Sequence, residues 1–132
     1  TPWTRQKMLK PNVTVSVKTH FMRSESRPDK KRFVYSYTIT IKNNGELAAQ
    51  LISRHWIITS GETLKTQEVS GDGVIGQQPN IQPGEHFTYT SGTVMDSAVG
   101  IMQGSYRMLD TQGEYFDVVI EPFTLAVPNQ LN

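Results

Sequence analysis

Residues 33–42 read FVYSYTITIK, and this stretch decides the fold class. Every second position is apolar: Phe33, Tyr35, Tyr37, Ile39 and Ile41. Successive side chains of a β-strand point to opposite faces of a sheet, so this period predicts a strand with one buried and one solvated face. Residues 43–45, Asn-Asn-Gly, then predict a turn, because these residue types accept a positive φ.

The same alternation recurs on both sides of this segment. Strands are predicted at residues 13–18, 33–42, 50–60, 64–69, 85–94, 101–109 and 116–120, with an edge segment at 125–127. Pro122 and Pro128 bound that last segment, because proline cannot donate to a central ladder. Residues 110–113 predict a hairpin turn. Short strands at this spacing predict an all-β fold, an antiparallel β-sandwich of immunoglobulin or fibronectin type III-like architecture.

Composition limits the classes of protein that the chain can belong to. Its 132 residues suit one domain, which we place at 12–128, after a loosely held basic segment (1–11) and before a C-terminal tail (129–132). The absence of cysteine excludes disulfides, iron–sulfur clusters, thiolate zinc sites and cysteine nucleophiles. The core must therefore be held by packing, and Trp56, Tyr37 and Phe116 are its predicted anchors.

Hydropathy predicts a cytoplasmic protein with no membrane partner. The longest apolar runs, such as residues 56–58, fall far short of the roughly 20 residues that span a bilayer. Residues 1–10 are polar and basic and lack the apolar segment of a secretory signal.

Charge is balanced in total, with a net value of +1, but not along the chain. Residues 1–44 carry ten Lys or Arg and two acids, whereas residues 45–132 carry three and ten. Such asymmetry can indicate a partner of one sign, although we favour halves that interleave in the fold. The run Lys30-Lys31-Arg32 could contact phosphates, but the aromatic residues after it fall on the predicted core face. A solvated hairpin tip is therefore favoured over nucleic-acid binding, which we consider unlikely.

Residues 71–76 read GDGVIG and match the pattern G-x-G-x-x-G. A dinucleotide site would need a helix directly after this motif, and Pro79 and Pro83 leave no room for one. Two interpretations remain open for Gly71, Gly73 and Gly76: a tight loop that needs positive φ, or a backbone nest that binds an anion. The tight loop is favoured, because Asp72 would repel an anion.

No catalytic or metal-binding set is visible. Asp117 and Glu121 share a predicted strand face but lie about 13 Å apart, farther than a glycosidase pair. His20, His55 and His86 have none of the local spacings of a metal site. We therefore expect no enzyme activity, no metal and no cofactor.

Several segments in order nevertheless resemble the ApaG family. They are RHWIIT (54–59), GDGVIGQQP (71–79), IQPGE (81–85), YTSG (89–92), GIMQGSY (100–106), FDVVIEPF (116–123) and LAVP (125–128). The likeness runs from about residue 13 to residue 128, and the order and spacing of the motifs are specific. The glycine loop of the family falls on Gly71, Gly73 and Gly76, and its Arg-aromatic-Trp segment on Arg54, His55 and Trp56. His55 is a departure, because tyrosine often stands there in the family.

The resemblance implies a fibronectin-type sandwich without an established enzymatic activity. Bacterial members of the family are linked genetically to cobalt resistance and magnesium efflux. Their gene tends to lie beside genes for diadenosine tetraphosphate hydrolysis and ribosomal RNA methylation. Eukaryotic relatives carry the domain in larger proteins, where it looks like a partner-binding module.

Three hypotheses of function follow, and we prefer the first. It is a non-enzymatic protein-interaction module, with Arg54, His55, Lys30, Lys31 and Arg32 as candidate surface residues and with edge strands that could pair with a partner or form a homodimer. The second is a sensor that binds a pyrophosphate-containing nucleotide or a divalent metal at residues 71–76. The third and weakest is nucleic-acid binding through the basic first third of the chain.

Overall fold

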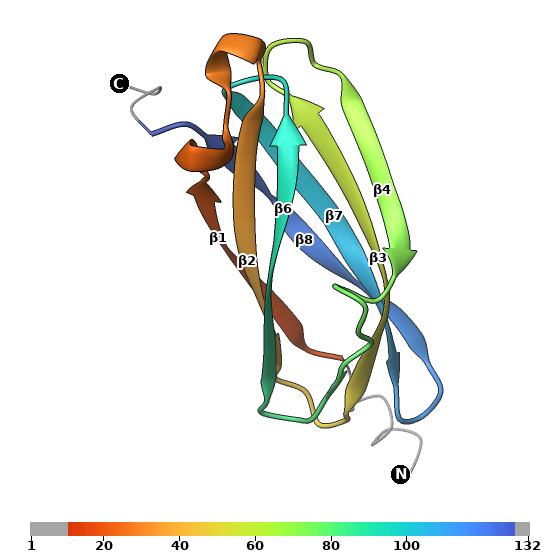
Figure 1. Ribbon diagram of the computed structural model, residues 1–132. Coiled ribbons are helices and arrows are strands. Elements are labelled where there is room, and N and C mark those ends of the chain that lie inside the picture. The colour runs from red at the N-terminus through yellow and green to blue at the C-terminus, as the bar shows by residue number, and fades with distance from the viewer. Residues whose placement is uncertain (1–10, 129–132) are drawn as a thin grey trace.

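The structure, a computed structural model, describes residues 11–128 as two antiparallel sheets packed face to face (Figure 1). The first sheet has the strand order β1-β2-β6, with β1 at Val13–Phe21, β2 at Phe33–Asn43 and β6 at His86–Met95. The second has the order β4-β3-β7-β8, with β3 at Ala49–Ser60, β4 at Thr66–Asp72, β7 at Val99–Asp110 and β8 at Tyr115–Ala126. The short β5 (Asn80–Ile81) pairs with β3. The predicted all-β sandwich is confirmed.

Helical structure among residues 11–128 is limited to two 3₁₀ turns, η1 (Arg23–Glu25) and η2 (Pro28–Lys30), between β1 and β2. No helix in this part of the chain has the length and hydrophobicity that crossing a bilayer requires. Residues 1–10 of the expected N-terminal segment and the expected tail (129–132) lie outside the described residues.

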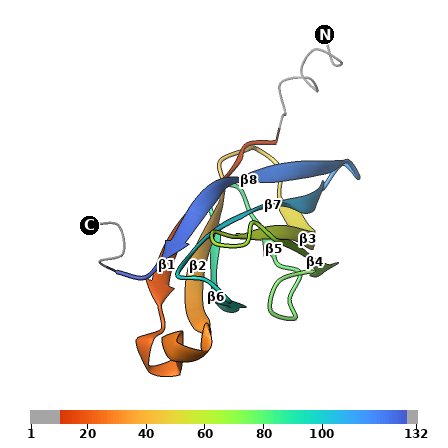
Figure 2. The same cartoon turned by 90° about the horizontal axis from the view of Figure 1, so that it is seen from above.

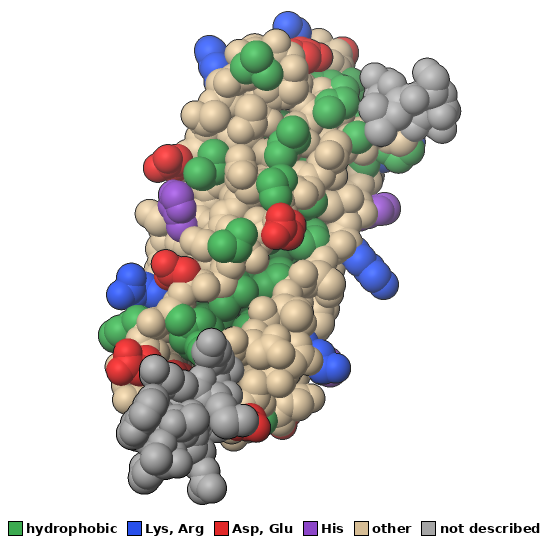
Figure 3. Space-filling model, turned by 180° about the vertical axis from the view of Figure 1, so that it is seen from behind, with side chains coloured by type: hydrophobic (Ala, Val, Ile, Leu, Met, Phe, Trp, Pro, Cys, Tyr) green, Lys and Arg blue, Asp and Glu red, His purple; other side chains and the backbone are tan. Residues whose placement is uncertain are grey.

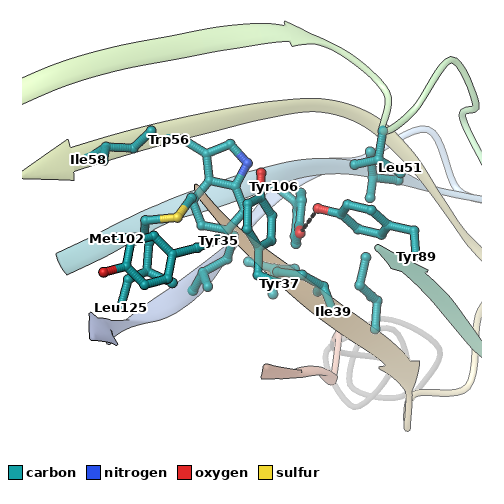
Figure 4. Close-up of a cluster of buried hydrophobic side chains, with 14 of the residues drawn as sticks. Tyr35, Tyr37, Ile39, Leu51, Trp56, Ile58, Tyr89, Met102, Tyr106 and Leu125 are labelled. Carbon is teal, nitrogen blue, oxygen red and sulfur yellow. Dashed lines mark hydrogen bonds between the residues drawn. The ribbon is translucent and has the colours of Figure 1, made fainter. Parts of the chain in front are cut away.

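The alternation in β2 sets the core. Its odd-numbered side chains from Phe33 to Ile41 are all buried between the sheets, as predicted. Trp56 of β3 contacts Tyr37 with ring centroids 5.5 Å apart and meets Tyr106 edge-on (Figure 4). Phe123 also meets Trp56 edge-on. Trp56 and Tyr37 are therefore core anchors, whereas Phe116 is only half-buried at the margin. Tyr35 and Tyr106 are more deeply buried than any of the three.

The last strand differs from its prediction. β8 runs without interruption through Pro122, where a break between two segments was expected. Met102 pairs with Phe123 but Gly104 pairs with Ile120, so a bulge in β8 takes up the extra residue. Pro122 is tolerated there because β8 is an edge strand and the bulge interrupts the ladder.

The two sides of the sandwich are unlike. On one side, the edge strands β1 and β8 contact each other and close the space between the sheets. On the other, β6 and β4 diverge, which gives the molecule the wedge shape visible from above (Figure 2).

The strands of the two sheets differ in charge. Strands β1, β2 and β6 carry Lys18 and Lys42 and no acid, whereas β3, β4, β7 and β8 carry five acids against two arginines, Arg54 and Arg107. The halves of the sequence do interleave in the first sheet, where β6 of the second half pairs with β2, but the strands of the two sheets keep opposite net charges. Figure 3 shows the molecule from behind, where acidic side chains lie beside a band of hydrophobic ones. Exposed Ile101, Tyr115 and Val119 belong to β7 and β8 in this second sheet.

Candidate functional site

A groove runs between β4 and β6 on the open side of the sandwich. One section has a volume of about 420 Å³ and is lined by Tyr37, Arg54, Trp56, Ile58, Gln67, Val69, Ser91, Gly92, Thr93 and Val94. An adjoining section of about 350 Å³ shares Ile58, Gln67 and Val94 and continues to Lys65 and Asp96. The floor of the larger section is aromatic and hydroxyl groups lie at its rim, so the groove offers both apolar contact and hydrogen bonding.

Arg54 lies in the wall of this groove and is held by the backbone of β4. Its Nη1 donates to the carbonyl oxygen of Asp72 at 3.1 Å and to that of Gly73 at 2.8 Å. Gly71 lies opposite Arg54 in the ladder, and a side chain there would come within 3.1 Å of the guanidinium nitrogens. Gly71 thus leaves the space in which the guanidinium lies.

The segment after β4 is a tight turn. Ile75 and Gly76 both have positive φ, at 43° and 77°, and the amides of Val74 and Gln77 donate to each other's carbonyl oxygens. This is the geometry of a type I′ turn. Gly73 also has a positive φ, at 63°, and donates its amide to Ile52.

The predicted anion nest at residues 71–76 therefore has few free amides. Those of Gly73 and Val74 already donate within the protein, as does that of Gln77 directly after it. The positive φ values of the tight-loop interpretation are present at Gly73 and Gly76 but not at Gly71. Ligand binding at this loop stays a prediction.

The remaining candidate residues lie apart from one another. Arg54 and Trp56 face the groove, so His55 between them faces the opposite side of the sheet, where its Nε2 lies 3.6 Å from a carboxylate oxygen of Glu68. Lys30, Lys31 and Arg32 are exposed at the tip of the β1–β2 connection, which the paired backbones of Arg27 and Arg32 close. The structure does not bring this basic run to the groove.

Two buried tyrosines lie behind Arg54. The hydroxyls of Tyr89 and Tyr106 hydrogen-bond to each other (Figure 4). Burial raises the pKa of Tyr89 to about 12 and also raises the pKa of Tyr106, while the Arg54 charge acts in the opposite direction on both. Both phenols are therefore neutral at ordinary pH and serve to fill and link the two sheets.

Among residues 11–128, no group of three or more His, Asp or Glu side chains converges as a metal site would require. In the described part of the chain, Asp96 is the one acidic side chain that lines the groove, and it accepts a hydrogen bond from the Ser60 hydroxyl at 2.9 Å.

Comparison with known proteins identifies the family. The model of the ApaG domain matches residues 23–110. The chain belongs to the ApaG family. It is 58% identical over 120 residues to Protein ApaG of Pseudomonas syringae pv. tomato and 56% identical to that of Ectopseudomonas mendocina, covering 91% of this chain and 94% of each relative. The predicted family is thus confirmed.

Solved ApaG-like structures share the fold. The crystal structure of the putative ApaA protein from Bordetella pertussis superposes with a TM-score of 0.88 at 45% sequence identity. The match covers 91% of this chain and 97% of that one. The sandwich described here is therefore the architecture of the family.

Two features of this ApaG domain were not predictable from the sequence patterns. One is the groove itself, because the order of strands in space decides which edges diverge. The other is the edge of β6, whose residues 88–95, TYTSGTVM, contain neither a charge nor a proline. The lack of charge and proline is visible in the sequence, but it indicates an unprotected edge only when the strand is known to lie at the edge of a sheet.

Proposed function

We propose that this chain is a non-enzymatic protein-interaction module that receives an extended segment of a partner as an additional strand along β6. One observation carries the proposal: β6 is an edge strand without the features that usually prevent pairing. Exposed edges present unpaired N–H and C=O groups, and proteins protect them with charges, prolines, bulges or covering segments.

The other three edges have such protection. β1 and β8 lie against each other, and β8 also carries the bulge with Pro122. β4 bears two acids, Glu68 and Asp72, within seven residues. β6 has ten residues and contains no Lys, Arg, Asp or Glu, with His86 at its very start.

The register of the first sheet shows which groups of β6 face outward from the edge. The Met22 amide donates to the Val34 carbonyl, so the even-numbered residues of β2 hydrogen-bond with β1. The odd-numbered residues then bond with β6, and Thr90, opposite Thr38, has its backbone groups on the free edge. A segment docked there would direct alternate side chains into the groove.

A selection for peptides tests this proposal. Random dodecapeptides displayed on phage are selected on the full chain, and synthetic copies of the enriched peptides are titrated against purified variants. Thr90→Pro removes an edge-facing amide and leaves the ladder with β2, so it should weaken binding by about tenfold or more.

Thr19→Pro is the matched control, because Thr19 is exposed and its amide points away from β2, outside the ladder of the first sheet. Peptides that bind wild type and Thr90→Pro equally would contradict strand addition at β6. Sedimentation of the wild-type chain adds a second readout. A dimer that Thr90→Pro dissociates would identify a second copy of the chain, rather than a different partner, as the added strand.

We propose further that the chain binds its partner in the cytoplasm, and that this binding underlies the link of the family to cobalt resistance and magnesium efflux. A bacterial strain that lacks its own ApaG protein supplies the test. If partner binding underlies the phenotype, the wild-type chain should restore growth in cobalt and Thr90→Pro should not. Equal rescue by both variants would separate the phenotype from the β6 edge.

A further inference from the structure

We infer that Arg54 binds the carboxylate of an aspartate or glutamate side chain on the docked partner segment. This inference rests on the proposed function, because it assumes that a strand added to β6 points side chains into the groove. It adds the chemistry by which the partner is recognised.

The guanidinium of Arg54 has no carboxylate within 4.0 Å in residues 11–128, where the closest approach of a cation to an acid is that of His55 to Glu68. Its hydrogen bonds within this part of the chain are the two from Nη1 to the carbonyl oxygens of Asp72 and Gly73. A guanidinium has five N–H donors, so donors remain for a ligand. Arg54 is half-buried, which makes an unneutralised charge more costly than at the surface.

The orientation of Arg54 is fixed before any ligand arrives. The missing side chain of Gly71 and the left-handed backbone of Gly73 bring the carbonyl acceptors within reach of Nη1. A side chain already ordered loses less entropy on binding. Arg54 is therefore prepared to receive a planar anion from the groove side.

The groove distinguishes a carboxylate from a phosphate. Phosphate sites usually combine cations with free backbone amides, whereas the amides of Gly73 and Val74 already donate within the protein. Among residues 11–128, Arg54 is the one cation that lines the larger section, and the adjoining section carries Lys65 together with Asp96. One positive charge beside loop amides that already donate within the protein suits a singly charged carboxylate.

The position of Arg54 predicts the pattern of the partner segment. Trp56 and Ile58 follow on the same face of β3 and line the groove beside Arg54. Residues two and four apart on a strand share a face, about 7 and 13 Å apart. The segment should therefore carry an acidic residue with an apolar residue two or four positions away.

An NMR titration tests the inference without waiting for the natural partner. The probes are two capped heptapeptides, Thr-Val-Thr-Glu-Thr-Val-Thr and the same peptide with Gln in place of Glu, together with inorganic phosphate. Saturable shifts are expected at the Arg54 Nε–H and the Trp56 indole N–H, with the Glu peptide binding about tenfold more tightly than the Gln peptide. In Arg54→Gln the two peptides should bind equally.

The outcomes separate this inference from the proposed function. Equal binding of both peptides to wild type, or none at millimolar concentration, would overturn the role of Arg54. Binding that persists in Thr90→Pro with the preference for Glu intact would overturn strand addition while supporting Arg54. Phosphate that shifts Arg54 as strongly as the Glu peptide would overturn the assignment to a carboxylate.

Discussion

The closed and open sides of the sandwich are both bounded by edge strands, but the strands meet on one side and stand apart on the other. On the closed side, β1 and β8 meet over buried side chains such as Leu125, and a bulge blunts the last edge. On the open side, β4 and β6 stand apart, and Trp56, Tyr37 and Arg54 line the groove between them. The difference teaches that the packing which closes the sandwich and the groove proposed for recognition lie on two sides of one core.

The largest effect should come from the closed side. Leu125→Ala removes a fully buried side chain from β8 and should lower the free energy of unfolding by about 2–5 kcal/mol. Val69→Ala on β4 is the matched truncation on the open side, where the half-buried valine borders the groove. Its cost should be about 1 kcal/mol, and urea unfolding measures both. Equal losses would contradict this difference between the two sides.

The next largest effect is expected at the start of the turn after β4, where the Gly73 carbonyl accepts a hydrogen bond from Arg54. Gly73→Ala places a methyl group against the Gln77 carbonyl at a positive φ and should cost about 2–3 kcal/mol. Gly76→Ala also has a positive φ but open space around it, so about 1 kcal/mol is expected. Peptide binding should fall in Gly73→Ala and change little in Gly76→Ala. A larger destabilisation in Gly76→Ala would mean that crowding at Gly73 is unimportant.

Alkaline pH should lower the free energy of unfolding through the buried tyrosines that join the sheets. Burial raises the pKa of Tyr35 and of Tyr89 to about 12, from 10 in the unfolded chain. Between pH 10 and 12 the unfolded state loses these protons and the folded state keeps them, so stability is complete below pH 10 and falls above it. The slope should be about 1.4 kcal/mol per pH unit for each such tyrosine. Urea unfolding of wild type and Tyr89→Phe at several pH values between 10 and 12 measures this pH dependence. If the free energy of unfolding falls equally steeply with pH in the variant, Tyr89 does not contribute to it.

The smallest effect is expected on the outer face of β3 and β4. The side chains of His55 and Glu68 are 43% and 69% exposed, so solvent largely screens their interaction. The ion pair also requires a protonated histidine. Glu68→Gln should change stability by less than about 0.5 kcal/mol, whether measured at pH 5 or pH 8. A loss well above that value would show that β4 depends on this pair.

The sequence predicted what local patterns determine. The alternation from Phe33 to Ile41 needs only the period of a strand, and the core followed from it. The continuity of β8 through Pro122 could not be predicted, since a bulge depends on how many residues the neighbouring strand presents. The direction of Arg54 escaped prediction for a similar reason, because Gly71, seventeen positions away, makes room for it. The edge of β6 required the order of the strands in space.

The separation of charge between the sheets gives the molecule an electric dipole across its thickness. The cationic end of that dipole lies on the sheet that contains β6, and the anionic end on the sheet of β7 and β8. Under the proposed function, an acidic partner segment would be turned toward this sheet before any contact forms. The rate of encounter should therefore fall with ionic strength, while the lifetime of the complex, set by short-range contacts, should change little.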